Sequence, residues 1–224
     1  MKTLLAALCT GLLIGVTASI GSSQDDPIPP GPVPCQLDWI IYDWDFQLGD
    51  CGFTPLDGAG SAVWEYGATG LIPDAPALVW GTVLEGTYPS NSGHSLISPA
   101  FTVSEETTLA EVVHYYDLQG TSAGCNMKVN GAILPPYSGY DGEIGSNCTQ
   151  VGGESGFTGF GGWRTDCFEL SSFWNQAITL QFDFGSDAST SSCPGWYLAA
   201  VRIGGVAPTL KEETTWTRIK SLFY

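Results

Sequence analysis

The sequence contains very few basic residues and histidines. Seven of its 224 residues are Lys or Arg against 23 Asp or Glu, which gives a net charge of −16, and only two are His. Nucleic acids and anionic membranes are bound through Lys and Arg that neutralise phosphate, so we expect neither as a partner. Two histidines also leave few ligands for a zinc site and few bases for a Ser-His-Asp triad. A solvated acidic surface explains the charge, and divalent-cation binding by clustered carboxylates is the alternative.

Long apolar runs are also lacking, because no stretch reaches the roughly 20 apolar residues of a membrane-spanning helix. The longest apolar run, residues 4–16, follows Lys2 and ends at the small residues of Val16-Thr17-Ala18. This is the plan of a secretory signal peptide. We therefore predict a signal peptide at residues 1–18, no membrane span, and a mature chain that is secreted or held at the cell surface.

Helical periodicity is absent from the remaining domain, while turn-forming residues are abundant, with 29 Gly and 14 Pro. Residues 19–36 form a proline-rich leader, and residues 37–207 have the length of one domain. A change of composition separates residues 208–224 as a C-terminal tail.

Alternating apolar and polar residues predict β-strands. The clearest is AITLQFDF, in which Ile178, Leu180, Phe182 and Phe184 fall on one face. Further strands are predicted at residues 37–46, 62–66, 77–81, 96–103, 108–118, 127–134, 163–170 and 196–203. Clusters of Gly, Pro, Asn, Asp and Ser separate them. The pattern predicts an all-β fold, an antiparallel β-sandwich of jelly-roll type.

Seven cysteines become six if Cys9 is removed with the signal peptide. An even number of cysteines in an exported chain predicts disulfides, whose connectivity the sequence does not fix. We expect three bridges that each close a loop: Cys35 with Cys51, Cys125 with Cys193, and Cys148 with Cys167.

Four segments occur in an order that resembles a known family. They are YDWDFQLGDCGFTPLDGAGSAVWEYG, NSGHSLISPAFTV, LAEVVHYYDLQG and ITLQFDFGSDASTSSCPGWYLAAVRIGG. Together they are similar to the MAM-like jelly-roll sandwiches attached to secreted bacterial metallopeptidases of the immune-inhibitor-A type. The resemblance implies a β-sandwich over nearly all of residues 37–206.

The last strand departs from that family, in which a pair of aspartates follows Gly-Trp and belongs to a region that can hold structural calcium. Ala199 and Ala200 stand at those positions here, and an alanine methyl group offers no oxygen ligand to a hard cation. We therefore expect no metal or other cofactor. Calcium held by other acids is the alternative, with Asp45 and Asp187 as weak candidates.

No catalytic motif is found. His-Glu-x-x-His is absent, and His114 shares its strand parity with Ala110, Val112 and Tyr116, which predicts a core or boundary position. His94 has no cysteine or carboxylate at catalytic spacing. A pair of carboxylates could serve a glycosidase, but the sequence does not single out two.

Aromatic residues are the more informative candidates for binding. Most of the eight tryptophans lie in predicted strands, where core packing is their usual role, although a few on one face would form a platform for sugar rings or peptide. Tyr88, Tyr137 and Tyr140 lie in Gly- and Pro-rich loops, where we expect exposure and contact with a ligand.

The C-terminal tail has its own pattern. Trp216, Ile219 and Phe223 fall on one face of a short helix, next to the basic Lys220. A terminal helix docked on the sandwich and a recognition or sorting signal are both consistent with it.

These observations predict a secreted, non-catalytic binding or adhesion module that recognises an extracellular protein or glycan. The alternative is a carbohydrate-active enzyme that resembles a glycoside hydrolase and uses an unassigned pair of carboxylates. Two close acids in a cleft flanked by Trp or Tyr would favour the enzyme.

Overall fold

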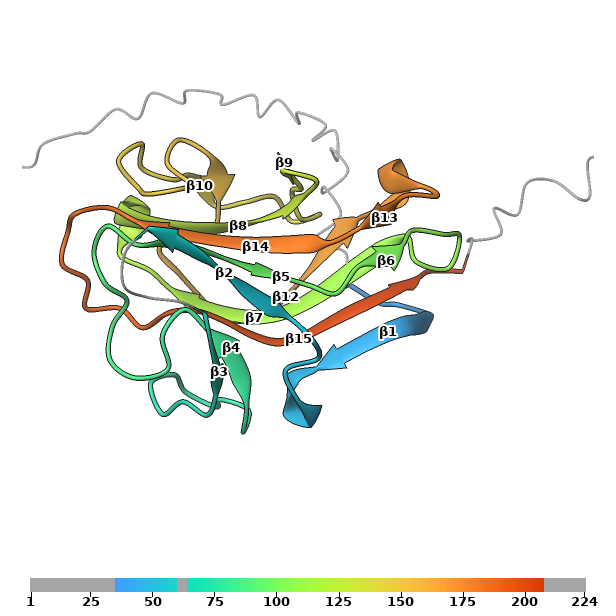
Figure 1. Ribbon diagram of the computed structural model, residues 1–224, viewed down its shortest axis with the longest axis horizontal. Helices are drawn as coiled ribbons and strands as arrows, with labels where there is room; N and C mark the ends of the chain where they lie inside the picture. The colour runs from blue at the N-terminus through green and yellow to red at the C-terminus, as the bar shows by residue number, and fades with distance from the viewer. Residues whose placement is uncertain (1–34, 60–63, 208–224) are drawn as a thin grey trace, which may run out of the picture. The chain divides into compact units, whose positions relative to one another are not determined.

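The computed structural model describes residues 35–59 and 64–207, which form two β-sheets packed face to face (Figure 1). The predicted signal peptide at 1–18, nearly all of the leader and the tail with Trp216, Ile219, Lys220 and Phe223 lie outside the described residues. Among the residues that are described, no helix is long and apolar enough to cross a membrane.

The first sheet has six strands. Its spatial order is β12 (Phe160–Glu169), β7 (Leu109–Asp117), β15 (Gly195–Gly205), β4 (Val79–Gly81) and β3 (Glu65–Gly67), and β1 (Trp39–Asp45) also pairs with β15. All of these pairings are antiparallel. β15 is therefore the central strand of this layer.

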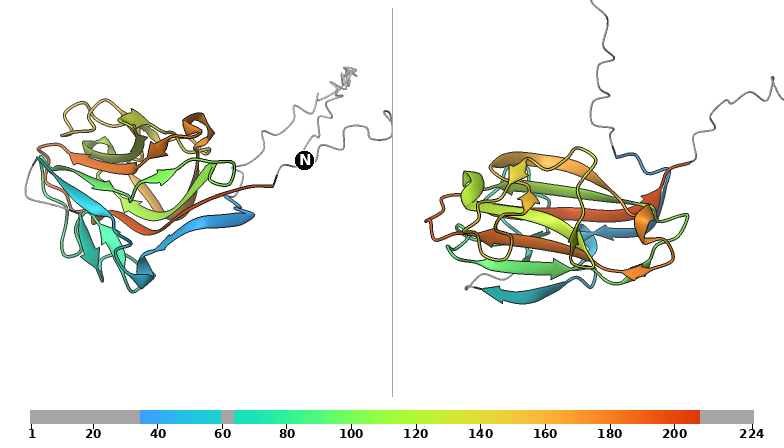
Figure 2. Two further views of the ribbon diagram at one scale, coloured as in Figure 1. Left: turned by 45° about the vertical axis from the view of Figure 1, so that its right-hand side comes forward. Right: turned by 90° about the horizontal axis from the view of Figure 1, so that it is seen from above.

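The second sheet has five strands. Its spatial order is β2 (Thr54–Ala59), β5 (Gly93–Ile97), β14 (Leu180–Ser186), β8 (Ala123–Val129) and β9 (Ala132–Ile133). Two short antiparallel pairs lie outside these sheets: β10 (Gly142–Glu143) with β11 (Ser155–Gly156), and β6 (Phe101–Thr102) with β13 (Ala177–Ile178). Single 3-10 turns occur at η1 (Phe46–Leu48), η2 (Gly120–Ser122) and η3 (Ser171–Phe173). Figure 2 shows the second sheet from above.

The principal strands cross repeatedly between the layers. From β5 onward, β5, β8 and β14 belong to the second sheet, whereas the intervening β7, β12 and β15 belong to the first. This alternation is the jelly-roll arrangement, so the predicted fold class is confirmed. Leu180, Phe182 and Phe184 are fully buried between the sheets, as their spacing predicts, and Phe182 contacts the buried ring of Trp196.

Strand boundaries differ from the prediction where turn residues occur in a strand. β2 was predicted as a turn because it contains Pro55 and Gly58, yet it pairs with β5. It lies at the edge of its sheet, where a proline needs no partner for the missing N–H group. β5 and β8 begin three and four residues before the predicted starts at 96 and 127, within segments of small and polar residues.

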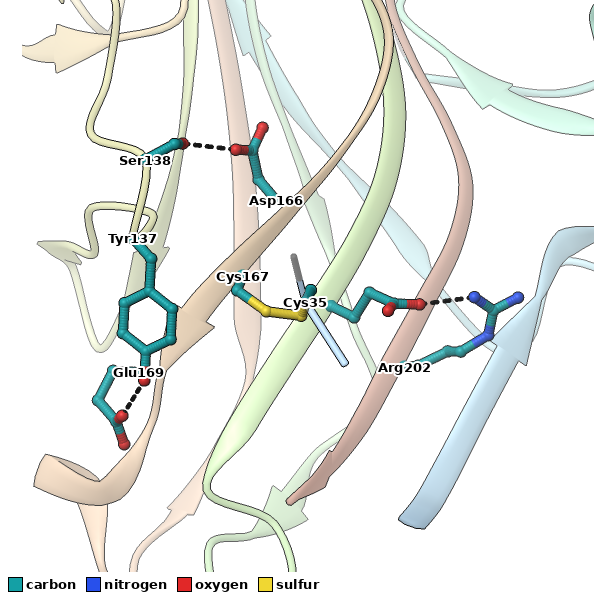
Figure 3. Close-up of a disulfide and its surroundings, with 8 residues drawn as sticks. Cys35, Tyr137, Ser138, Asp166, Cys167, Glu169 and Arg202 are labelled. Atoms are coloured by element: carbon teal, nitrogen blue, oxygen red, sulfur yellow. Dashed lines mark hydrogen bonds and ion pairs between the residues drawn. A yellow bond between two sulfur atoms is a disulfide. The ribbon is translucent and has the colours of Figure 1, made fainter. Parts of the chain in front are cut away.

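One disulfide joins Cys35 to Cys167, with the two Cα atoms 5.3 Å apart (Figure 3). All three predicted pairings were wrong, and Cys51, Cys125, Cys148 and Cys193 are free thiols. The observed bridge joins more distant cysteines than any predicted pair, because it spans 132 residues of sequence.

The bridge connects strands that are distant in sequence because of the sheet order. β1 pairs with β15, β15 with β7, and β7 with β12, so the segment before β1 crosses two strands to reach Cys167 in β12. Cys167 alternates with the buried Phe168 and therefore faces the outer side of the sheet. Arg202, which is labelled in Figure 3, lies on the same side. It pairs with Glu111 at 2.6 Å and with Asp43 at 3.2 Å.

Candidate functional site

An open groove lies at the end of the sandwich where β1 begins and β15 ends, beside β6 and β13 (Figure 1). Its volume is about 740 Å³, which is within the range of ligand pockets. It is lined by two tryptophans, two glutamates and three smaller side chains: Trp39, Ile41, Glu105, Glu106, Thr108, Trp174 and Val206.

Trp39 is held in place by contacts with Glu106 and Gly205. Its indole N–H donates a hydrogen bond of 2.9 Å to the carbonyl oxygen of Glu106. Its ring lies over Gly205 of β15, where a Cβ atom would be 2.7 Å from the indole. Glycine at 205 therefore leaves the space that the ring occupies, and the orientation of Trp39 is set before any ligand binds.

Trp174 reaches the groove from a tight turn. Its backbone N–H donates to the carbonyl of Ser171 at 3.2 Å, and the next residue, Asn175, adopts a left-handed φ of 56°. Asn175 in turn donates to the carbonyl of Val103 at 2.9 Å, which ties this turn to the segment after β6. Trp174 is 42 % exposed, so much of its ring remains available for contact.

Glu105 and Glu106 occupy the turn between β6 and β7, and both are exposed. The turn is ordered by its own side chains, because the Ser104 N–H donates to Thr107 Oγ1 at 2.7 Å and the Glu106 N–H donates to Ser104 Oγ at 3.2 Å. Two carboxylates on a fixed turn provide acceptors for hydroxyl or ammonium groups beside the tryptophan rings. The groove therefore combines apolar ring faces with a local negative charge.

A cluster around His114 contains the residue types of a catalytic triad but not its geometry. Ser138 Oγ donates to Asp166 Oδ1 at 2.6 Å, and Asp166 Oδ2 lies 2.8 Å from His114 Nε2. The other ring nitrogen, Nδ1, accepts a hydrogen bond from the indole N–H of Trp196 at 2.9 Å. Both nitrogens of a fully buried imidazole are thus engaged, so His114 has no nitrogen left to receive a proton from a serine. The predicted core position of His114 is confirmed.

The three tyrosines predicted to contact a ligand differ in exposure. Tyr88 is only 2 % exposed and packs edge-on against Phe184, so its predicted exposure was wrong. Tyr140 is half-buried, and its hydroxyl donates to the Leu134 carbonyl at 2.7 Å. Tyr137 is exposed and hydrogen-bonds Glu169, and it is not one of the residues that line the groove. A ligand-contact role remains a prediction, and Tyr137 alone of the three has an exposed ring.

The weak metal candidates have structural roles. Asp45 caps η1 by accepting a hydrogen bond of 2.9 Å from the Gln47 N–H, and Asp187 accepts one of 2.7 Å from the Ser189 N–H. No group of three or more His, Cys, Asp or Glu that could hold a metal ion occurs in residues 35–59 and 64–207. Ala199 and Ala200 are buried in β15. Calcium binding stays an untested alternative.

The groove residues were not identified from the sequence. Trp39 lies in a predicted strand, where core packing is the usual role, and Trp174 was not singled out. The position of Trp174 in the polar segment SSFWNQ between two predicted strands is the signal that could have indicated exposure. The two glutamates carry no comparable signal, because the chain has 23 acidic residues.

Comparisons with known proteins give distant structural likenesses only. No family model and no curated protein matches the chain. A carbohydrate-binding module from Cellvibrio mixtus lichenase 5A, solved with cellotriose, is 11 % identical, with a TM-score of 0.38 over 75 % of this chain and 100 % of the module. The K1 cleaved adhesin domain of Lys-gingipain from Porphyromonas gingivalis W83 is 17 % identical, with a TM-score of 0.46 over 74 % of this chain and 98 % of that domain.

A glycoside hydrolase also shows a likeness. The catalytic domain of a GH87 alpha-1,3-glucanase is 10 % identical, with a TM-score of 0.31 over 71 % of this chain and 29 % of the hydrolase. Likenesses of this strength do not establish the MAM-like family and carry no functional argument. The function is therefore argued from the groove itself.

Proposed function

We propose that the chain is an exported, non-catalytic binding module, and that its ligand is an oligosaccharide held in the groove between Trp39 and Trp174. The observation that carries the proposal is the pairing of two tryptophans, one fixed and one prominently exposed, with two carboxylates in one open groove. Sugar rings present apolar C–H faces that pack on indole rings, and their hydroxyl groups donate hydrogen bonds to carboxylates. The groove supplies both kinds of contact.

The charge of the groove defines the sugar class. Glu105 and Glu106 would repel the carboxylates of uronic acids and the sulfates of sulfated glycans, because no Lys or Arg is among the residues that line the groove to offset them. Neutral sugars and amino sugars avoid this repulsion, and amino sugars gain an ion pair. The proposed ligands are therefore neutral or amino-sugar oligosaccharides.

A glycan array tests this proposal when it is probed with the mature chain and two aromatic variants. Trp174→Ala removes one wall of the groove, and a buried aromatic contact of this kind contributes about 2 kcal/mol, or about 30-fold in affinity. Phe160→Ala is the matched control, since Phe160 is 71 % exposed at the opposite end of β12 from the groove.

The parent and Phe160→Ala should bind the same neutral or amino sugars, and Trp174→Ala should lose them. Equal binding by all three proteins would place the ligand elsewhere. A parent that binds no glycan but captures peptides from a parallel peptide array would overturn the oligosaccharide assignment.

A carbohydrate-active enzyme is the second candidate, because two acids do lie beside two tryptophans. Their placement does not suit glycoside hydrolysis, in which two carboxyl groups flank the scissile bond and the acid is shielded from water. Glu105 and Glu106 are consecutive residues of one turn, and both are exposed. Release of reducing sugar by the parent, abolished in Glu105→Gln or Glu106→Gln, would favour the enzyme.

A further inference from the structure

We propose that the C-terminal tail, residues 208–224, docks into the Trp39–Trp174 groove of its own chain. The groove wall already contains the end of the domain, because Val206 is a lining residue and the described chain ends at Ala207. The tail therefore starts at the groove. Trp216 is nine residues from Ala207, a span of at most about 30 Å, so the tail needs no rearrangement of the sandwich to reach the site.

The distribution of basic residues supports this occupant. The chain has seven: Lys2, Lys128, Arg164, Arg202, Lys211, Arg218 and Lys220. Lys2 belongs to the predicted signal peptide, and the three cations in the described residues are held in ion pairs and do not line the groove. Lys128 lies 2.8 Å from Glu154 and Arg164 lies 2.6 Å from Asp166, while Arg202 contacts Glu111. Only the tail retains cations that could neutralise Glu105 and Glu106.

The tail also carries apolar residues that match the groove. Trp216, Ile219 and Phe223 recur at the spacing of one helix face, and Arg218 and Lys220 lie between them. An amphipathic segment of this kind places its apolar side against the tryptophans and its cations near the turn with the two glutamates. The leader fits less well, because residues 19–34 contain Asp25 and Asp26 but no basic residue.

Docking has a consequence for ligand binding. A tethered segment has an effective concentration of about millimolar at its site, so even weak intrinsic affinity leaves the tail bound much of the time. The tail would then act as an intramolecular competitor of the oligosaccharide. This consequence rests on the proposed function, whereas docking itself does not.

Zero-length carbodiimide cross-linking of the full mature chain tests the docking directly. The reagent joins a lysine amine to a carboxylate in contact with it, and mass spectrometry identifies the joined peptides. We expect links from Lys211 or Lys220 to Glu105 or Glu106, and none to Glu143, an equally exposed acid on β10. Trp216→Ser with Phe223→Ser should lower the yield at Glu105 and Glu106 by about threefold or more, because the apolar anchor is lost.

A mixture of ¹⁴N- and ¹⁵N-labelled chains distinguishes docking of a chain's own tail from docking of the tail of a second copy. Links within one isotope class support docking of the tail on its own chain, whereas links between classes would assign the groove to the tail of a second copy and overturn the proposal. Links spread evenly over exposed acids, or none at Glu105 and Glu106, would also overturn it. The glycan array reads the proposed function separately, so either proposal can fail while the other stands.

Discussion

At the scale of single residues, the imidazole of His114 is fixed in one neutral tautomer. Nδ1 accepts from Trp196, so Nε2 carries the hydrogen and donates to Asp166. Burial lowers the pKa of His114, and the hydrogen bond to Asp166 only partly offsets this effect. A second proton on Nδ1 would face the indole N–H, so the folded chain resists protonation that the unfolded chain accepts near pH 6.5.

This tautomer predicts a loss of stability in mild acid. The unfolded state binds the proton as pH falls below about 6.5 while the folded state does not, so the free energy of unfolding should decrease by about 1 kcal/mol between pH 7.5 and 5.5. Asp166 does not titrate between pH 7.5 and 5.5 and so does not contribute to this change in stability. Burial would raise its pKa, but hydrogen bonds from His114, Ser138 and Arg164 outweigh burial and lower the pKa to about 2. Urea unfolding at the two pH values measures the change.

The variant His114→Gln isolates this residue from His94, which is the other histidine of the chain. It should be less stable than the parent at pH 7.5 by about 1–3 kcal/mol, because Trp196 or Asp166 loses a buried partner. Its stability should change less between pH 7.5 and 5.5 than that of the parent. An equal pH dependence in both proteins would refute the assignment to His114.

At the scale of elements, the Cys35–Cys167 bridge holds the start of the domain against β12. Cys35→Ser with Cys167→Ser should lower the free energy of unfolding by roughly 2–5 kcal/mol, since the bridge restricts the unfolded chain over 132 residues. Thermal or urea unfolding provides the measurement. Cys193→Ser, which removes a half-buried free thiol, is the control and should change stability little. Similar losses in both variants would show that the bridge is not the source.

The loop that contains Thr149 passes closely over β14, and Gly185 makes this approach possible. A Cβ atom at Gly185 would overlap the carbonyl oxygen of Thr149, whereas a Cβ atom at Gly142 would meet nothing within 4 Å. Gly185→Ala should therefore destabilise the domain by about 1–3 kcal/mol, and Gly142→Ala should be close to neutral. Thermal melts of the two variants check this difference, and equal melting temperatures would contradict it.

Elements with strong local patterns were predicted correctly. The strands predicted at 108–118 and 196–203 correspond to β7 and β15. Alternation in residues 177–184 located β14, although Ala177 and Ile178 form the separate strand β13 that pairs with β6. β2 was missed because its proline and glycine indicate a turn locally, and only its place at the sheet edge makes them acceptable. The disulfide was missed for a related reason, because sheet order decides which cysteines meet.

At the scale of the whole molecule, the free thiols differ from the expectation for an exported chain. Burial raises the pKa of the Cys148 thiol to about 11 and raises that of Cys125 well above its ordinary value. Both should react slowly with iodoacetamide in the folded protein and quickly after unfolding, because the thiolate is the reactive form. Peptide mapping should find Cys35 linked to Cys167 and the other four described cysteines alkylated after denaturation without reductant. Further disulfides among those four would contradict the structure.

The groove could not be predicted because it exists only at the level of the folded chain. Its residues come from positions 39, 41, 105, 106, 108, 174 and 206, which no local pattern connects. The sequence predicted a binding module from the ordered resemblance to MAM-like sandwiches, in which no catalytic motif was found. The jelly-roll connections then bring the start of β1, the end of β15 and two turns to one end of the sandwich (Figure 1).

Hydrogen exchange of backbone amides, with and without the strongest-binding oligosaccharide of the array, tests most directly whether this groove is the ligand site. Ligand contact should slow exchange in peptides that cover residues 104–108 and 173–176, and leave peptides around Phe160 unchanged. Protection confined to another face, with no change at the Glu105–Glu106 turn or at Trp174, would contradict the account.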